Sequence, residues 1–175
     1  MKSFLAVRGL PVVTVAEGGY AGKLDDFLFR FDDVAILGFR LRAPGFWGGA
    51  LGVACENVVR LGRDYVLVSG DDVVERERGG GVVSADRAWW SDWVGVKVLA
   101  RRGTDLGRVE DVLVDERPSR LRALVLDGGR VVLPGRKALV GRDAVIVDEE
   151  AAVHVFPEKH ESAEWWEKVT QVVGG

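Results

Sequence analysis

Gly22-Lys-Leu-Asp-Asp-Phe-Leu-Phe-Arg30 and Gly107-Arg-Val-Glu-Asp-Val-Leu-Val-Asp115 are two copies of one pattern, set 85 residues apart. The glycine, the second acidic residue and the leucine are identical, and the remaining apolar residues fall at the same positions. Alternating apolar residues are typical of a strand with one buried face. The two stretches therefore predict equivalent strands, and they set the register in which the rest of the chain is compared.

A second pair of matching segments lies at the end of each copy. Leu61-Gly-Arg-Asp-Tyr-Val-Leu-Val68 aligns with Val140-Gly-Arg-Asp-Ala-Val-Ile-Val147 at an offset of 79 residues. The difference between the two offsets falls in one place, where residues 43–53 stand opposite the shorter stretch 128–132. Insertions are tolerated best in loops between strands. The chain is therefore predicted to contain an internal duplication.

Short strands separated by turn signals make up the second copy. Asp127-Gly-Gly129 is a strong hairpin signal, and glycine or proline marks the other turns. The predicted strands are Val96–Ala100, Gly107–Asp115, Arg120–Leu126, Arg130–Pro134 and Ala144–Val147. Short strands at this spacing are typical of a small barrel. We expect an all-β protein of two small β-barrels in tandem.

The domain boundaries follow from composition. The first barrel is predicted over residues 1–74 and the second over 93–148, with a linker at 75–92 that contains a charge cluster followed by glycines. Residues 149–175 form a tail with a predicted amphipathic helix at 158–173. Its apolar stripe is formed by Trp165 or Trp166, Val169, and Val172 or Val173.

These motifs resemble the PRC-barrel domain family. The resemblance rests on the run glycine, apolar, aspartate, apolar-Leu-apolar, then a hairpin, Val-Leu-Pro134 and Gly141-Arg-Asp-Ala-Val-Ile-Val147, and it covers Trp93 to Asp148. The first copy is more divergent, with Ala54-Cys55 where the second has Leu133-Pro134. The resemblance implies a tandem PRC-barrel protein. Related barrels occur in the H subunit of purple bacterial reaction centres and in a 16S rRNA maturation factor. The family supplies no catalytic residues.

Composition limits the class of partner. The net charge of −3 and pI near 5.5 disfavour a general nucleic-acid binder. Cys55 is the one cysteine, so no disulfide can form within the chain, and a buried structural thiol is expected. Arg8 interrupts the apolar start, which does not resemble a signal peptide, and no uncharged run is long enough to span a bilayer. A cytoplasmic, bacterial protein is predicted.

No constellation predicts catalysis. Neighbours in a strand point to opposite faces, so the pairs Asp25-Asp26 and Glu110-Asp111 do not converge on one substrate atom. A structural role is predicted for them, with carboxylates that accept hydrogen bonds from turn amides. His154 and His160 lack companions at metal-ligand spacing. No catalytic residue, metal or cofactor is expected, and the protein is predicted not to be an enzyme.

Aromatic residues outside the strand patterns are the first candidates for binding a partner. They are Phe46, Trp47, Trp89, Trp90, Trp93, Trp165 and Trp166. Tryptophan is enriched in binding hot spots, which favours an adaptor or scaffold that binds a protein partner of unknown identity, or a homodimer contact. A second interpretation also stays open, in which these rings cover barrel openings or fill the seam between the barrels.

A basic face on the second barrel gives the alternative function. Its residues are Arg117, Arg120, Arg122, Arg136 and Lys137. They could bind RNA phosphates in a ribosome-associated maturation or assembly factor, or they could be an ordinary solvated face. Aromatic residues for base stacking are not interleaved with them.

Overall fold

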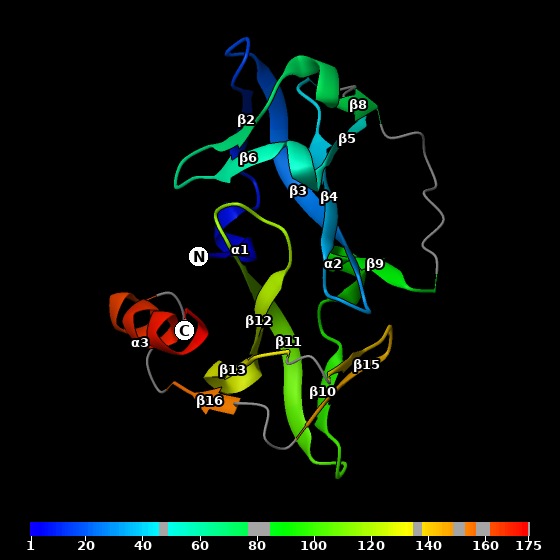
Figure 1. Cartoon of the computed structure of the whole chain (residues 1–175), viewed down its shortest axis with the longest axis vertical. Coiled ribbons are helices and arrows are strands. Elements are labelled where there is room, and N and C mark those ends of the chain that lie inside the picture. Colours follow the sequence, from blue (N-terminus) through cyan, green and yellow to red (C-terminus); the bar gives the residue numbers. More distant parts are fainter. Residues whose placement is uncertain (46–48, 77–84, 135–137, 149–152, 157–161, 175) are drawn as a thin grey trace.

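The computed structural model describes residues 1–45, 49–76, 85–134, 138–148, 153–156 and 162–174. The described chain is mostly β, with two sheets of eight strands each and few helices. The first sheet forms the upper half of Figure 1 and the second sheet the lower half.

The first sheet has the strand order β6-β7-β2-β3-β4-β5-β8, and β9 pairs with β3 beside this path. The long strand β3 contains the first copy of the sequence pattern. The strands are β2 (Pro11–Thr14), β3 (Tyr20–Arg30), β4 (Ile36–Arg42), β5 (Ala50–Ala54), β6 (Val58–Leu61), β7 (Val66–Val68), β8 (Glu75–Arg76) and β9 (Arg87–Trp89).

The second sheet repeats this order as β14-β15-β10-β11-β12-β13-β16, and β1 pairs with β11 beside the path. The strands are β1 (Lys2–Ser3), β10 (Lys97–Ala100), β11 (Asp105–Val114), β12 (Leu121–Leu126), β13 (Arg130–Val132), β14 (Leu139–Val140), β15 (Ala144–Val147) and β16 (Val153–Val155). Neither sheet closes on itself among the described pairings, so the expected closed barrels are not confirmed.

The two halves exchange their first strands. β1 precedes the first half in sequence, yet Ser3 pairs with Leu113 on β11. β9 precedes the second half, yet Trp89 pairs with Leu28 on β3. Each exchanged strand leads into a four-residue helix, α1 (Phe4–Val7) or α2 (Trp90–Trp93), and both helices lie between the halves in Figure 1.

Part of the predicted linker is therefore ordered structure. β8, β9 and the start of α2 fall within residues 75–92. The strand character of residues 87–89 comes from pairing with β3, more than 50 residues earlier in the chain, and no local pattern reveals such a partner. The division at residues 74 and 93 remains a prediction from sequence.

The tips of two hairpins also meet between the halves. The amide of Ile36 donates to the carbonyl of Ser119, and the amide of Leu121 donates to the carbonyl of Val34, both at 2.9 Å. These two bonds are equivalent under the offset of 85 residues. Val34 has φ of 51°, a conformation that β-branched residues rarely adopt. The β3–β4 and β11–β12 hairpins point toward each other in Figure 1.

A continuous hydrophobic core joins the two halves. It contains residues from both sheets, and the rings of Trp90 and Trp93 lie within it, each 1% exposed. Trp90 stacks on Phe27 with 6.1 Å between ring centroids, and Trp93 meets Phe29 edge-on at 4.9 Å. The indole nitrogen of Trp93 donates to the carbonyl of Gly141 at 2.9 Å. α2 therefore connects a strand of the first sheet to a turn of the second.

A second, smaller core lies on the outer face of the second sheet. Helix α3 (Ala163–Val173) covers this face, and its buried stripe is Trp165, Val169 and Val173. The side chain of Ser162 accepts a hydrogen bond from the amide of Trp165 at 3.1 Å. Because Ser162 caps the helix in an extended conformation, α3 begins at Ala163, not at residue 158 as predicted. The predicted C-terminal helix itself is confirmed.

Replacing Trp90 by alanine tests the shared core. Trp90→Ala removes a buried ring that contacts both Phe4 and Phe27, so we expect the free energy of unfolding to fall by about 3–5 kcal/mol. Because the core is continuous, urea unfolding followed by far-UV circular dichroism should remain one transition. Tyr65→Ala, at a side chain 53% exposed, is the control. A loss below about 1 kcal/mol for Trp90→Ala, or two separate transitions in the wild type, would contradict this.

Candidate functional site

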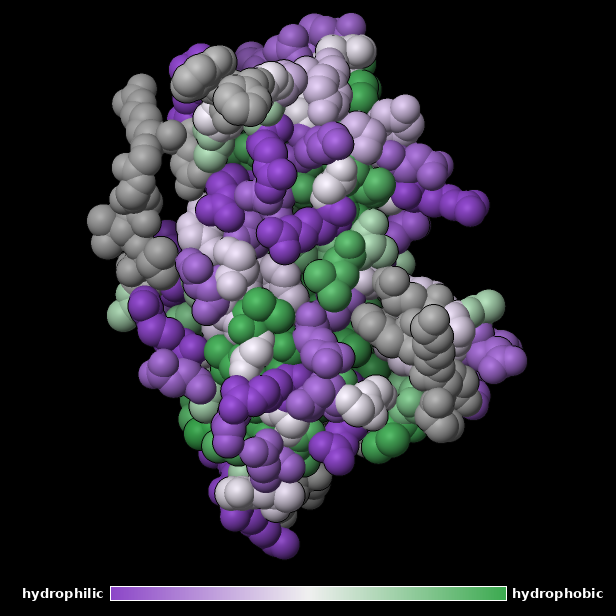
Figure 2. All heavy atoms as spheres, turned by 180° about the vertical axis from the view of Figure 1, so that it is seen from behind, coloured by the Kyte–Doolittle hydropathy of each residue, from purple (hydrophilic) through white to green (hydrophobic). Residues whose placement is uncertain are grey.

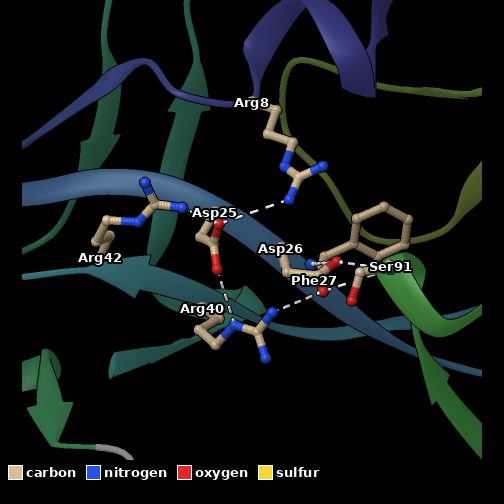
Figure 3. A network of polar contacts seen from close by, with 7 residues as sticks. All are labelled: Arg8, Asp25, Asp26, Phe27, Arg40, Arg42 and Ser91. Atoms are coloured by element: carbon tan, nitrogen blue, oxygen red, sulfur yellow. Dashed lines mark hydrogen bonds and ion pairs between the residues drawn. The ribbon is translucent and has the colours of Figure 1, made fainter. Parts of the chain in front are cut away.

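Asp26 lies at the point where the two halves cross, and its side chain is 0% exposed. One carboxylate oxygen accepts hydrogen bonds from the amide of Ser91 at 3.2 Å and from the amide of Phe27 at 2.9 Å. The other oxygen pairs with the guanidinium of Arg40 at 3.0 Å. Figure 3 shows these groups converging from β3, β4 and α2. A strand of the first half thus holds the helix that begins the second half.

Asp25 lies beside Asp26 on the more accessible side of this network. Its carboxylate meets Arg40 and Arg42, each at 3.1 Å, and Arg8 at 3.7 Å (Figure 3). Arg40 therefore bridges both carboxylates, and its guanidinium carbon also lies 4.8 Å from the ring centroid of Trp89. Both carboxylates of this network are paired with guanidinium groups from within the first half, and the network fixes β9 and α2 on the first sheet.

Asp111 of the second half makes the corresponding contacts with the start of α1, which belongs to the first half. It is buried on β11, and it accepts hydrogen bonds from the amide of Leu5 at 3.2 Å, from the amide of Val112 at 2.8 Å and from the hydroxyl of Ser3. Leu5 and Ser91 occupy the same place in the exchanged helices α1 and α2. Each buried aspartate therefore binds an amide at the start of the other half's short helix, where a negative charge is favourable.

The predicted structural role is confirmed for Asp26 and Asp111, with one correction, whereas Glu110 is exposed. The amides that Asp26 and Asp111 bind belong to the following residue and to the exchanged helix, not to the adjacent glycine turn. Burial raises the pKa of Asp26, although the hydrogen bonds from Ser91 and Phe27 and the charge of Arg40 act in the opposite direction.

Three of the six tryptophans predicted to bind a partner are buried. Trp90, Trp93 and Trp165 are at most 1% exposed, so they offer no surface to another protein. The structure corrects this part of the prediction: these rings fill the space between the sheets and beneath α3. Trp89 and Trp166 are half-buried, and Phe46 and Trp47 lie outside the described residues.

The predicted basic face is not continuous over the described residues. Arg117 and Arg120 are exposed, whereas Arg122 is half-buried and donates to the carbonyl of Val173 at 3.2 Å. Glu116, next to Arg117 in the sequence, pairs with Arg60 of the first half. Arg136 and Lys137 lie outside the described part of the chain. On the face in Figure 2, hydrophilic residues are spread over both halves and mixed with hydrophobic ones.

The first sheet carries a hollow on its outer face that sequence reasoning missed. Its volume is about 470 Å³. Leu28, Gly38 and Gly52 line it from three adjacent strands, and Trp89 lines it from β9. Polar lining is contributed by η2 (Asp71–Val73) and β8, through Asp72, Glu75 and Arg76. We call this hollow the open-face groove.

The open-face groove lies on the strands that correspond to those under α3. Leu28 pairs with Gly38 as Leu113 pairs with Ala123. Arg40 pairs with Gly52 as Val125 pairs with Val131. In the second sheet α3 covers this face, while no helix among the described residues covers it in the first. Glycines replace alanine and valine here, and a β-carbon at Gly52 would meet nothing within 4 Å.

Cys55 is buried as predicted, in the short helix η1 (Cys55–Asn57). Its thiol donates to the carbonyl of Pro118 at 3.0 Å, a contact between the two halves. Burial, with a smaller contribution from the charge of Glu56, raises the pKa of Cys55 to about 11. The thiol is therefore protonated at neutral pH.

Neither a metal site nor a membrane helix is found in the part of the chain that the structure describes. No three His, Cys, Asp or Glu side chains there gather closely enough to hold a metal ion. None of the described helices has the length and apolar character needed to cross a membrane.

Asp26→Asn tests the effect of burial on this carboxyl. A raised pKa means that the folded chain binds the Asp26 proton more tightly than the unfolded chain does. Protonation of Asp26 therefore stabilises the fold, and this contribution is lost as pH rises through the folded pKa. The free energy of unfolding of wild type minus that of Asp26→Asn should therefore fall as pH rises from about 3 to about 7.

The matched control, Asp33→Asn, is expected to show the opposite pH dependence. Arg30 lowers the pKa of Asp33, so the same difference for Asp33→Asn should rise with pH over that window. Chemical denaturation at several pH values measures both slopes. A rising difference for Asp26→Asn would show that Arg40 and the amides outweigh burial.

Cys55 should resist thiol reagents in the folded protein. Its raised pKa and its burial both limit attack by the thiolate. At pH 8 we expect labelling by a disulfide reagent to be at least about 100-fold slower than in denaturant, as followed by absorbance. Labelling at a rate similar to that of the unfolded chain would mean that the contact between Cys55 and Pro118 opens readily.

Comparison with known proteins agrees with the second half of this architecture. Residues 86–154 match the family model of the PRC-barrel domain. A search among curated proteins finds no match. The matched region begins just before β9, so it includes the exchanged strand and α2 as well as β10 to β15. This match to residues 86–154 confirms the resemblance to the PRC-barrel domain family that was inferred from the sequence.

Proposed function

We propose that this chain is a non-catalytic adaptor or scaffold that binds a protein partner, and that its first half is a second PRC-barrel-like unit. The open-face groove carries the proposal. It is a hollow of about 470 Å³ on a sheet face whose counterpart is covered by a helix. A PRC-barrel domain also suggests an interaction or assembly role in general.

Two features support binding at this face rather than at the tryptophans. The groove joins apolar surface from Leu28 and Trp89 with a polar edge from Asp72, Glu75 and Arg76, a combination typical of protein-binding sites. Trp90, Trp93 and Trp165 stabilise the fold from within. The partner contact therefore shifts to Trp89, which is the half-buried tryptophan that lines the groove.

A role without catalysis is supported by the state of the buried acidic groups. Asp26 and Asp111 accept hydrogen bonds from backbone amides and contact Arg40 or Ser3. Carboxylates held in this way stabilise the fold and have little freedom to act on a substrate. We also propose a cytoplasmic location, since one cysteine suits a reducing compartment.

Blocking the groove tests the proposal. The tagged full chain is used to capture proteins from native lysate, with and without nuclease and at two salt concentrations. Gly52→Trp fills the groove, so the captured partner should decrease by at least about tenfold. Val15→Trp adds the same ring at an exposed position on another part of the first half and should leave capture unchanged.

Two outcomes would overturn the proposal. One is capture that is equal in Gly52→Trp and wild type. The other is capture of ribosomal proteins alone, with loss on nuclease or high salt, because that dependence indicates phosphate contacts. The second outcome would favour a ribosome-associated factor and direct attention to Arg117 and Arg120.

A further inference from the structure

We infer that the open-face groove binds an amphipathic α-helix of the partner, one with bulky apolar residues at helical spacing and basic residues beside them. This inference rests on the proposed function and names the partner's structure. It is carried by the relation between the two sheets and by the charges at the edge of the groove.

The chain already contains a helix seated on the corresponding face of the second sheet. α3 presents Trp165, Val169 and Val173, which are four residues apart and lie on one side of the helix. They pack on Leu113, Ala123, Val125 and Val131 from β11, β12 and β13. The same three strands of the first sheet have a matching register. Arg40 stands there in the place of Val125, with its guanidinium drawn against the Trp89 ring, and the strands offer a helix the same backbone platform.

Among the described residues the first sheet has no α-helix of its own on this face. After β16 the chain continues only into the tail, and the tail folds back as α3. After β8 the chain continues to β9, which must pair with β3. Among the described residues the segment that follows β8 becomes β9 and connects the halves, so the helix that we place on this face is one supplied by another molecule.

The lining of the groove determines how large the apolar side chains of the ligand helix must be. Gly38 and Gly52 stand where the second sheet has Ala123 and Val131. The surface of the first sheet is therefore recessed at these two positions. Trp89 borders the recess, at the position that Ser3 of β1 holds in the second sheet. A helix that fills this space needs large apolar residues, such as tryptophan or leucine.

The charges at the edge of the groove favour basic residues beside the apolar stripe of the ligand helix. They disfavour binding of α3 from a second copy of this chain. Asp72 and Glu75 line the groove against one cation, Arg76, and Arg40 is paired with Asp25 and Asp26. The net negative edge favours lysine or arginine on the ligand. α3 carries Glu164 and Glu167 on its exposed side, so the α3 of a second copy would meet like charges here.

An extended peptide added to the sheet edge is a weaker alternative. β-strand addition needs a row of unpaired backbone groups along an edge strand. The edge strand beside the groove, β8, is only two residues long. It offers few such groups, whereas the face formed by β3, β4 and β5 is broad.

The probe is a synthetic peptide of residues 162–174 with capped ends, carrying Glu164→Lys and Glu167→Lys for the acidic edge, and Val169→Leu and Val173→Leu for the space over the glycines. Its affinity for the full chain is measured by fluorescence anisotropy and its position by amide chemical shifts. We expect shifts centred on Gly38, Gly52 and the Trp89 indole. A matched peptide that carries Val169→Pro in place of Val169→Leu should bind at least about tenfold more weakly, because proline breaks the helix. The peptide with both glutamates retained should also bind more weakly.

The outcomes separate this inference from the proposed function. Loss of binding in Gly52→Trp, with retention in Val15→Trp, supports a helix in the groove. Equal binding of the helical and the Val169→Pro peptides, or shifts confined to the second sheet, overturns the inference. If the helical peptide fails while capture from lysate still depends on Gly52, the protein is an adaptor whose partner is not a helix. If capture is also independent of Gly52, both proposals are overturned.

Discussion

A buried aspartate that holds the first turn of a helix from the other half is the interaction on which this structure depends. It occurs twice, with Asp26 bound to the amide of Ser91 and Asp111 bound to the amide of Leu5. A buried carboxylate is unfavourable unless its oxygens are satisfied, and in each case the exchanged arm supplies at least one of the donors. Removing an arm would leave a charge buried without these donors, so the arms and the sheets require each other.

The exchange explains why the two halves share one core. β9 and α2 bring Trp90 and Trp93 against the phenylalanines of β3, while α1 brings Phe4 into the same cluster. The hairpin tips add two backbone hydrogen bonds with equivalent geometry. The aromatic residues that suggest a binding surface from sequence are thus used to join the halves.

The difference between the two outer faces is the basis of the functional proposals. Both sheets present the same three strands with the same pairing. One face is apolar and carries α3, and the other contains two glycines, a tryptophan and an acidic edge. The second sheet thus covers this face with a helix of its own chain, and the corresponding face of the first sheet is where we propose that a partner binds.

The sequence by itself determined the local patterns of this protein. The two copies of the pattern at Gly22 and Gly107 became β3 and β11, the amphipathic tail became α3, and the PRC-barrel resemblance of the second half was correct, because period, turn residues and motif are local signals. Only the tertiary structure decided that Asp26 and Asp111 bind the opposite half's helices, that residues 87–89 form a strand, and that Trp90, Trp93 and Trp165 are buried. These features depend on contacts between residues far apart in the chain. The groove is likewise a tertiary feature, because it depends on which segment of the chain packs on the outer face of each sheet.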